Sequence, residues 1–121
     1  MAVAAPRIGA RSDRAAVRRS AAEVAAFYEL ARLEAIYRAS RVRVEFRRDS
    51  LWVVLEDGSE AVLLGRAGPS RHGVDLTASR SIIRIHPNGL GFGGANTTLV
   101  LRRGSAAESL TTSRLGRLRW R

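Results

Sequence analysis

Residues 31–46 read Ala-Arg-Leu-Glu-Ala-Ile-Tyr-Arg-Ala-Ser-Arg-Val-Arg-Val-Glu-Phe, and the spacing of the apolar residues changes within this stretch. Up to Tyr37 they recur every three to four residues, which is the period of an α-helix. From Val42 they alternate with charged residues, which is the period of a half-buried strand. The stretch therefore predicts a helix that is followed directly by a strand.

The predicted helix extends toward the N-terminus. Ser12 is a suitable N-cap and no Gly or Pro follows it before Gly58, so we expect the helix over residues 12–39. Its main apolar stripe consists of Val17, Ala21, Val24, Tyr28, Ala31 and Ala35. A second stripe, formed by Leu30, Leu33 and Tyr37, falls nearly opposite in the last turns. A helix with two stripes is either enclosed at that end or contacts two partners.

The rest of the chain reads as strands and turns. Asp57-Gly58 is a hairpin signal, Pro87-Asn88-Gly89 is a turn, and residues 65–80 read as a loop with room for a short strand at 74–76. The other expected strands are residues 42–46, 51–56, 60–64, 82–86, 97–102, 109–113 and 118–120. We therefore expect an α+β fold in a single domain, residues 1–121, with a helical part (1–39) packed on a β region (41–121) of about six or seven antiparallel strands.

Length and composition limit the function classes. The chain has 121 residues, too few for a (β/α)₈ barrel, and its lack of Cys excludes disulfides, zinc sites built on thiolates and Cys nucleophiles. All 21 basic residues are Arg and the net charge is +10, divided as +6 over residues 1–48, −1 over 49–101 and +5 over 102–121. Such basic ends are typical either of a surface for an anionic partner or of an ordinary solvated surface.

No motif indicates an enzyme. The two histidines, His72 and His86, lie in a loop and a turn without a motif partner, and their spacing without Cys is not that of a metal site. Residues 89–94 match Gly-x-Gly-x-x-Gly, but β-forming residues follow where a dinucleotide site needs a helix. We expect solvated histidines, a Gly-rich turn, and no catalytic residue, metal, cofactor or small-molecule substrate.

The C-terminal tail carries the clearest binding pattern. Arg117, Arg119 and Arg121 alternate, so a strand would place them on one face about 6 to 7 Å apart, with Leu118 and Trp120 facing the core. Together with Arg114 they are candidate phosphate ligands, because Arg forks bind phosphate oxygens and add a salt-dependent attraction to DNA. The alternative is an edge strand whose charges prevent pairing with other chains.

Four segments, in this order and spacing, carry a family resemblance. They are residues 31–38 (Ala-Arg-Leu-Glu-Ala-Ile-Tyr-Arg) with the basic strand after them, Trp52 with Asp57-Gly58, residues 85–89 (Ile-His-Pro-Asn-Gly), and residues 113–118 (Ser-Arg-Leu-Gly-Arg-Leu). Over residues 6–121 the chain resembles the GspH/FimT group of type II secretion minor pseudopilins and type IV minor pilins. Residues 1–6 resemble the last turn of that group's membrane helix, so we expect a chain that starts late, without the leader and most of that helix.

The resemblance implies a structural subunit rather than an enzyme. Such a protein is held in the bacterial inner membrane by a single N-terminal helix, with its domain in the periplasm, and joins other pseudopilins or pilins in a filament. Leu30, Leu33 and Tyr37 would then pack on neighbouring subunits. In the DNA-uptake branch of the group, a C-terminal Gly-Arg-x-Arg is associated with binding duplex DNA, and residues 116–119 match it. The resemblance leaves secretion and DNA uptake as alternatives.

Overall fold

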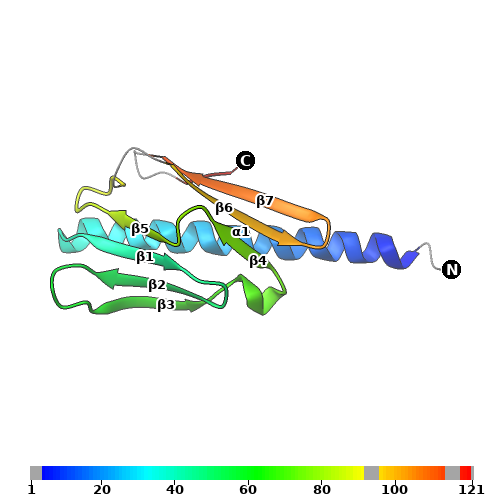
Figure 1. Ribbon diagram of the computed structural model, residues 1–121, viewed down its shortest axis with the longest axis horizontal. Coiled ribbons are helices and arrows are strands. Elements are labelled where there is room, and N and C mark those ends of the chain that lie inside the picture. The colour runs from blue at the N-terminus through cyan, green and yellow to red at the C-terminus, as the bar shows by residue number, and fades with distance from the viewer. Residues whose placement is uncertain (1–3, 92–95, 114–117, 121) are drawn as a thin grey trace.

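The computed structural model describes residues 4–91, 96–113 and 118–120, with side chains from residue 9 onward (Figure 1). Its helix α1 spans Ala4–Arg38, so the start expected at Ser12 is wrong. Pro6 is compatible with the helix because it lies in the first turn, where backbone N–H groups have no helical partner. Gly9 lies farther in and costs the helix about 1 kcal/mol relative to Ala. The N-terminal part of α1 extends past the strands (Figure 1).

The helix ends abruptly, which allows the first strand to begin four residues later. Ala39 has a positive φ of 48°, and the Ser40 N–H donates to the carbonyl of Ala35 at 3.1 Å. This arrangement is a Schellman-type cap, in which a left-handed residue reverses the chain and satisfies a free carbonyl. The change of period in the sequence thus coincides with a sharp turn.

Eight strands in the described residues form two antiparallel sheets. The first sheet has the order β3-β2-β1-β5 and consists of β1 (Val42–Phe46), β2 (Ser50–Leu55), β3 (Val62–Ala67) and β5 (Ile82–Ile85). The second has the order β4-β6-β7-β8 and consists of β4 (Asp75–Ala78), β6 (Thr97–Arg103), β7 (Ala106–Thr112) and β8 (Leu118–Trp120). A short 3-10 helix, η1 (Pro69–His72), connects β3 to β4.

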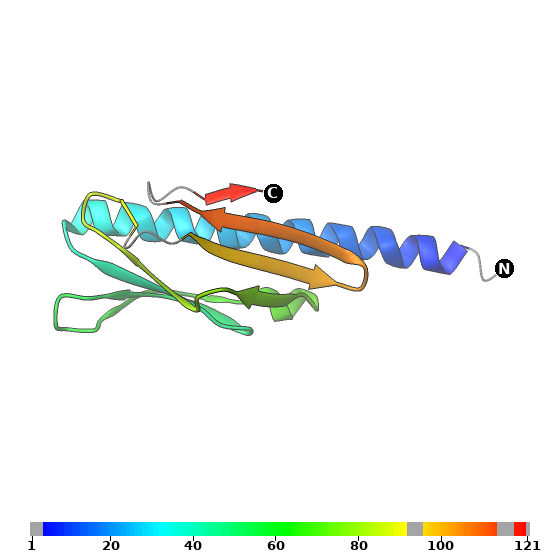
Figure 2. The same cartoon turned by 45° about the horizontal axis from the view of Figure 1, so that its top comes forward.

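The helix packs on both sheets (Figure 2). All six residues of its predicted main stripe are buried, and they meet the inward side chains of β1, β6 and β7, such as Val44, Leu99 and Leu110. Three alanines in the stripe let the helix approach the sheets closely. The α+β fold with a long N-terminal helix on antiparallel sheets is confirmed, with eight strands rather than six or seven.

The region expected to be a loop differs most from the prediction. Residues 65–80 contain the end of β3, η1 and β4, and β3 starts two residues later than expected and continues to Ala67. The end of β3 is difficult to predict from the sequence because Gly65 lies within it and glycine has low β-propensity. In the structure Gly65 packs against the Trp52 ring, so closely that a Cβ atom at this position would be 2.8 Å from a ring carbon. β7 also begins three residues earlier than expected, at Ala106.

Candidate assembly and anion-binding surfaces

The second stripe of α1 faces solvent. Leu30, Leu33 and Tyr37 are 43%, 52% and 87% exposed, so nothing within the described residues encloses them. Ile36, which we did not single out from the sequence, adds a fourth exposed apolar side chain; its spacing of three from Leu33 was the available signal. Exposed apolar residues that cluster on one surface mark interaction sites.

A groove continues this apolar face toward the first sheet. It has a volume of about 270 Å³ and runs between α1 and the edge strand β3. Its floor is apolar and its rim carries both signs of charge; the lining residues are Glu23, Ala26, Phe27, Leu30, Leu51, Arg66, Ala67 and Arg71. The groove and the second stripe share Leu30, so they form one continuous surface.

Beside the groove, charged residues attach η1 to the helix. Arg71 donates to the Glu23 carboxylate at 2.9 Å, and the Nε2 atom of His72 lies 3.1 Å from the same oxygen. Burial alone would raise the pKa of Glu23, but the hydrogen bonds from Arg71 and His72 outweigh it and hold the pKa below its ordinary value. His72 is 19% exposed, so the expectation of a solvated loop histidine is wrong. Its partner is 49 residues away in the sequence, and no local pattern could have indicated it.

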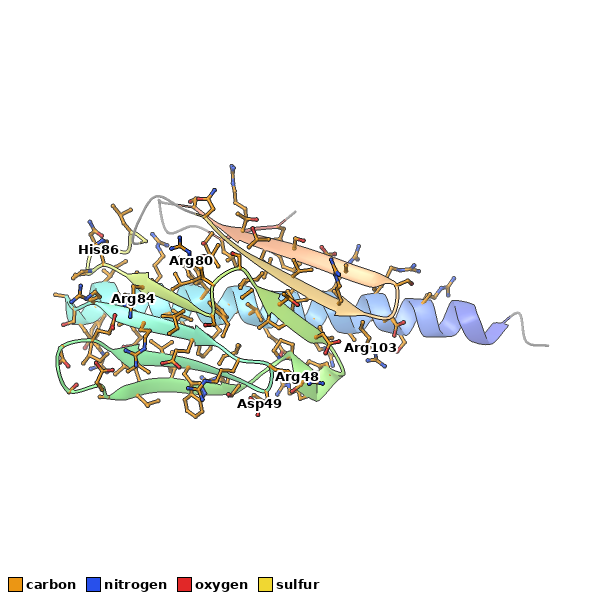
Figure 3. The ribbon with its side chains drawn as sticks, viewed as in Figure 1. Arg48, Asp49, Arg80, Arg84, His86 and Arg103 are labelled. Atoms are coloured by element: carbon orange, nitrogen blue, oxygen red, sulfur yellow. The ribbon has the colours of Figure 1, made fainter. Side chains whose placement is uncertain are left out.

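The same cluster extends to the end of β6. Arg103, labelled in Figure 3, pairs with Asp13 of α1 at 3.1 Å and donates to the backbone carbonyl of His72 at 2.8 Å. Each charged side chain of the cluster is bound by an opposite charge or a backbone carbonyl. The cluster therefore serves to join the elements of the fold. Within the described residues, no group of three or more His, Cys, Asp or Glu side chains is placed to hold a metal ion.

The Gly-rich segment forms a turn that packs on the helix. Gly89 has a φ of +84°, and its carbonyl accepts a hydrogen bond from Arg32 Nε at 3.1 Å. Gly91 makes a bridge to Ile85, whereas Gly93 and Gly94 lie outside the described residues. The part that is described therefore agrees with a turn between strands rather than a dinucleotide loop.

One of the four candidate phosphate ligands can be placed. Arg119 is exposed on β8, the edge strand of the second sheet, where it pairs in register with Thr111. Arg114, Arg117 and Arg121 lie outside the described residues. Leu118 packs against the core as expected, but Trp120 is 49% exposed. The expectation of a core-facing Trp120 is wrong in part, because an edge strand has no further strand to cover its outer side.

A long N-terminal helix that lies across two antiparallel sheets is the architecture of a pilin-like protein. The model of the GspH family, described as type II transport protein GspH, matches residues 20–116, and the chain belongs to this family. The fold is similar to that of the type IV minor pilin FimU of Pseudomonas aeruginosa strain PAO1 in two crystal forms. In space group P21 the TM-score is 0.74 at 19% identity, covering 87% of each chain. In space group P65 the TM-score is 0.71 at 19% identity, covering 86% of this chain and 91% of the other. No curated protein matches the chain.

The predicted GspH/FimT resemblance is therefore confirmed. The family comprises minor pseudopilins and minor pilins, structural subunits that are anchored in the inner membrane and carry a periplasmic globular domain. In the part of this chain that the structure describes, no helix combines the length and apolarity needed to cross a bilayer.

Proposed function

We propose that the protein is a minor pseudopilin, a structural subunit of the type II secretion pseudopilus that supports protein export across the outer membrane. The observation that carries this proposal is the uncovered apolar face of α1. Leu33 and Tyr37 are more than half exposed at the end of a helix whose opposite side is fully buried, and the groove beside Leu30 extends the same surface. In a filament, the helix packs on its own sheets through one face and on a neighbouring subunit through the other.

A substitution test separates assembly from folding. Leu33→Ser with Tyr37→Ser should leave the melting temperature nearly unchanged, because both side chains are exposed, and should abolish secretion in cells that carry the intact secretion system. The control Val24→Ser, on the buried stripe, should lower the melting temperature strongly. Unchanged secretion in the double variant, or a loss of stability equal to that of the control, would overturn the assembly role of this face.

Cross-linking locates the contact directly. Because the chain has no Cys, a single cysteine can be introduced at position 33 and compared with one at the exposed position Thr77 on β4. Cross-links to other pilus subunits in cells are expected for Leu33→Cys and not for Thr77→Cys. Equal cross-linking of both variants would indicate random collision.

A second function, DNA binding by a minor pilin used in DNA uptake, is favoured by a different observation. Arg119 is exposed on an edge strand, in a segment whose balance is +5 over residues 102–121. If Arg117 and Arg119 contact phosphates, replacing both with Ala should reduce the slope of log affinity against log salt by about two units. The measurement is a mobility-shift assay on duplex DNA at several salt concentrations, and absence of binding at low salt would remove this function.

A further inference from the structure

The N-terminal part of α1 carries a stripe of arginines that neither function uses. Arg11, Arg14 and Arg18 are all exposed and are separated by three and four residues. At 100° per residue they fall within an arc of about 60°, and the stripe is about 10 Å long. This N-terminal arm of α1 runs from the end of the helix that extends past the strands (Figure 1) to the β6–β7 turn, which Arg14 and Arg18 adjoin.

The stripe keeps most of its charge. Asp13 is the one acid in residues 4–22, and it is bound by Arg103 on another face of the helix. Within the described residues, Arg11 and Arg14 form no ion pair. Arg18 forms one loose pair, with Glu108 at 4.0 Å. Three guanidinium groups therefore share one narrow face with one carboxylate at its end.

A hollow of about 240 Å³ adjoins the stripe where the helix meets the β6–β7 turn. Arg14 and Arg18 line it on one side, and Ser105, Ala106 and Ala107 line it on the other. Its two remaining lining residues are Val17 and Glu108. A phosphate group with its glycerol fits a space of this size, and two planar guanidinium forks are suited to its oxygens.

We propose that this arginine stripe binds the headgroups of anionic phospholipids. The family's domain lies in the periplasm next to the inner membrane, so headgroup phosphates are the polyanion that it meets at high local concentration. Residues 4–26 contain no aromatic side chain for insertion between lipids or stacking on bases. The interaction is therefore electrostatic and disappears as salt shortens the Debye length from about 10 Å at 0.1 M toward 3 Å at 1 M.

The 121-residue chain can be tested directly on vesicles, independently of secretion. It should sediment with vesicles of phosphatidylglycerol and phosphatidylcholine in equal parts, and not with phosphatidylcholine alone. Since each surface Arg contributes about fivefold, Arg11→Ala with Arg14→Ala and Arg18→Ala should weaken partitioning on the order of 100-fold. Glu108→Gln should strengthen it a few-fold, because Arg18 loses its competing carboxylate.

A matched control removes the same charge elsewhere. Arg48, Arg66 and Arg80 are exposed in the sheet region, and Figure 3 shows Arg48 and Arg80 away from the arm. Replacing these three with Ala should change vesicle binding much less. Equal losses in the two triple variants would overturn the proposal, since net charge alone would explain binding. A stripe variant that loses affinity for duplex DNA but keeps its vesicle binding would also overturn it and assign the stripe to nucleic acid.

Discussion

The Nε2 atom of His72 lies 3.1 Å from Oε1 of Glu23, and this contact joins η1 to the middle of α1. Arg71 holds the same carboxylate at 2.9 Å. The carboxylate of Glu23 therefore joins two successive residues of η1 to the helix. Glu23 and Arg71 also line the groove beside Leu30, so their contact helps to fix the shape of the surface proposed for assembly.

Replacing Glu23 with Gln should destabilise the protein in a pH-dependent way. The native pKa of Glu23 is lowered, so its contribution is present above the unfolded value near 4.5 and is lost as the pH falls below it. We expect a loss of about 1 kcal/mol at pH 7 for this partly exposed group, shrinking toward zero as the pH falls through the lowered native pKa of Glu23. Urea unfolding of both proteins from pH 3 to 8 measures it. Glu29→Gln, on the exposed side of the helix, is the control; a pH-independent difference for Glu23→Gln would contradict the prediction.

Gly68 should be among the least replaceable residues of the β region. A Cβ at this position would lie 2.7 Å from the backbone N of Ser50 and 2.8 Å from the carbonyl oxygen of Arg48, and a backbone cannot move aside as a side chain can. We expect Gly68→Ala to cost about 2 to 3 kcal/mol. Gly58→Ala is the control: its φ is +97° but nothing lies within 4 Å, so backbone strain alone should cost about 1 kcal/mol. Equal melting temperatures for the two variants would show that the contact at Gly68 relaxes.

Residues 31–46 and the missed contacts show what the sequence could and could not predict. The main stripe of α1 and the alternation from Val42 to Phe46 are local patterns set by burial, and both were predicted correctly. The start of β7 was missed because Ala106 and Ala107 have weak β-propensity and are held by their pairing with Arg103 and Arg102. The Glu23–His72 contact depends on tertiary packing across 49 residues, so no spacing rule could reveal it.

Tyr28 should make the protein sensitive to alkali. Burial raises the pKa of Tyr28 to about 12, whereas the unfolded chain ionises it near 10. The native state is therefore favoured below pH 10 and loses about 2 kcal/mol as the pH rises from 10 to 12. Within the described residues the Tyr28 hydroxyl has no hydrogen-bond partner, so Tyr28→Phe should cost less than about 1 kcal/mol at pH 8. Thermal unfolding between pH 8 and 12 should give a flatter profile for Tyr28→Phe; profiles of equal slope would refute the assignment to Tyr28.

The charged network on the outer face of the first sheet should contribute far more to the free energy of unfolding than the ion pairs of the helix. Arg43 on β1 is 18% exposed and pairs with Glu45 at 2.8 Å and Glu56 at 3.1 Å, both 15% exposed. Hydrogen bonding to Arg43 lowers the pKa of Glu45, so removing the guanidinium leaves partly buried carboxylates with weaker partners.

Arg43→Gln should therefore cost about 2 kcal/mol, below the 3 to 5 kcal/mol typical of breaking a buried pair, because Arg47 and Arg84 still hold the two acids. Arg38→Gln breaks the helical i,i+4 pair with Glu34, whose nitrogen–oxygen distance of 2.7 Å is similar but whose side chains are more exposed. This substitution should cost at most about 0.5 kcal/mol. Urea unfolding at pH 7 compares the two variants. As the pH falls through the lowered pKa of Glu45, the Arg43→Gln penalty should shrink, since protonation removes the charge that Arg43 stabilises. A penalty that stays constant throughout an acid titration would mean that Arg43 acts through packing of its stem alone.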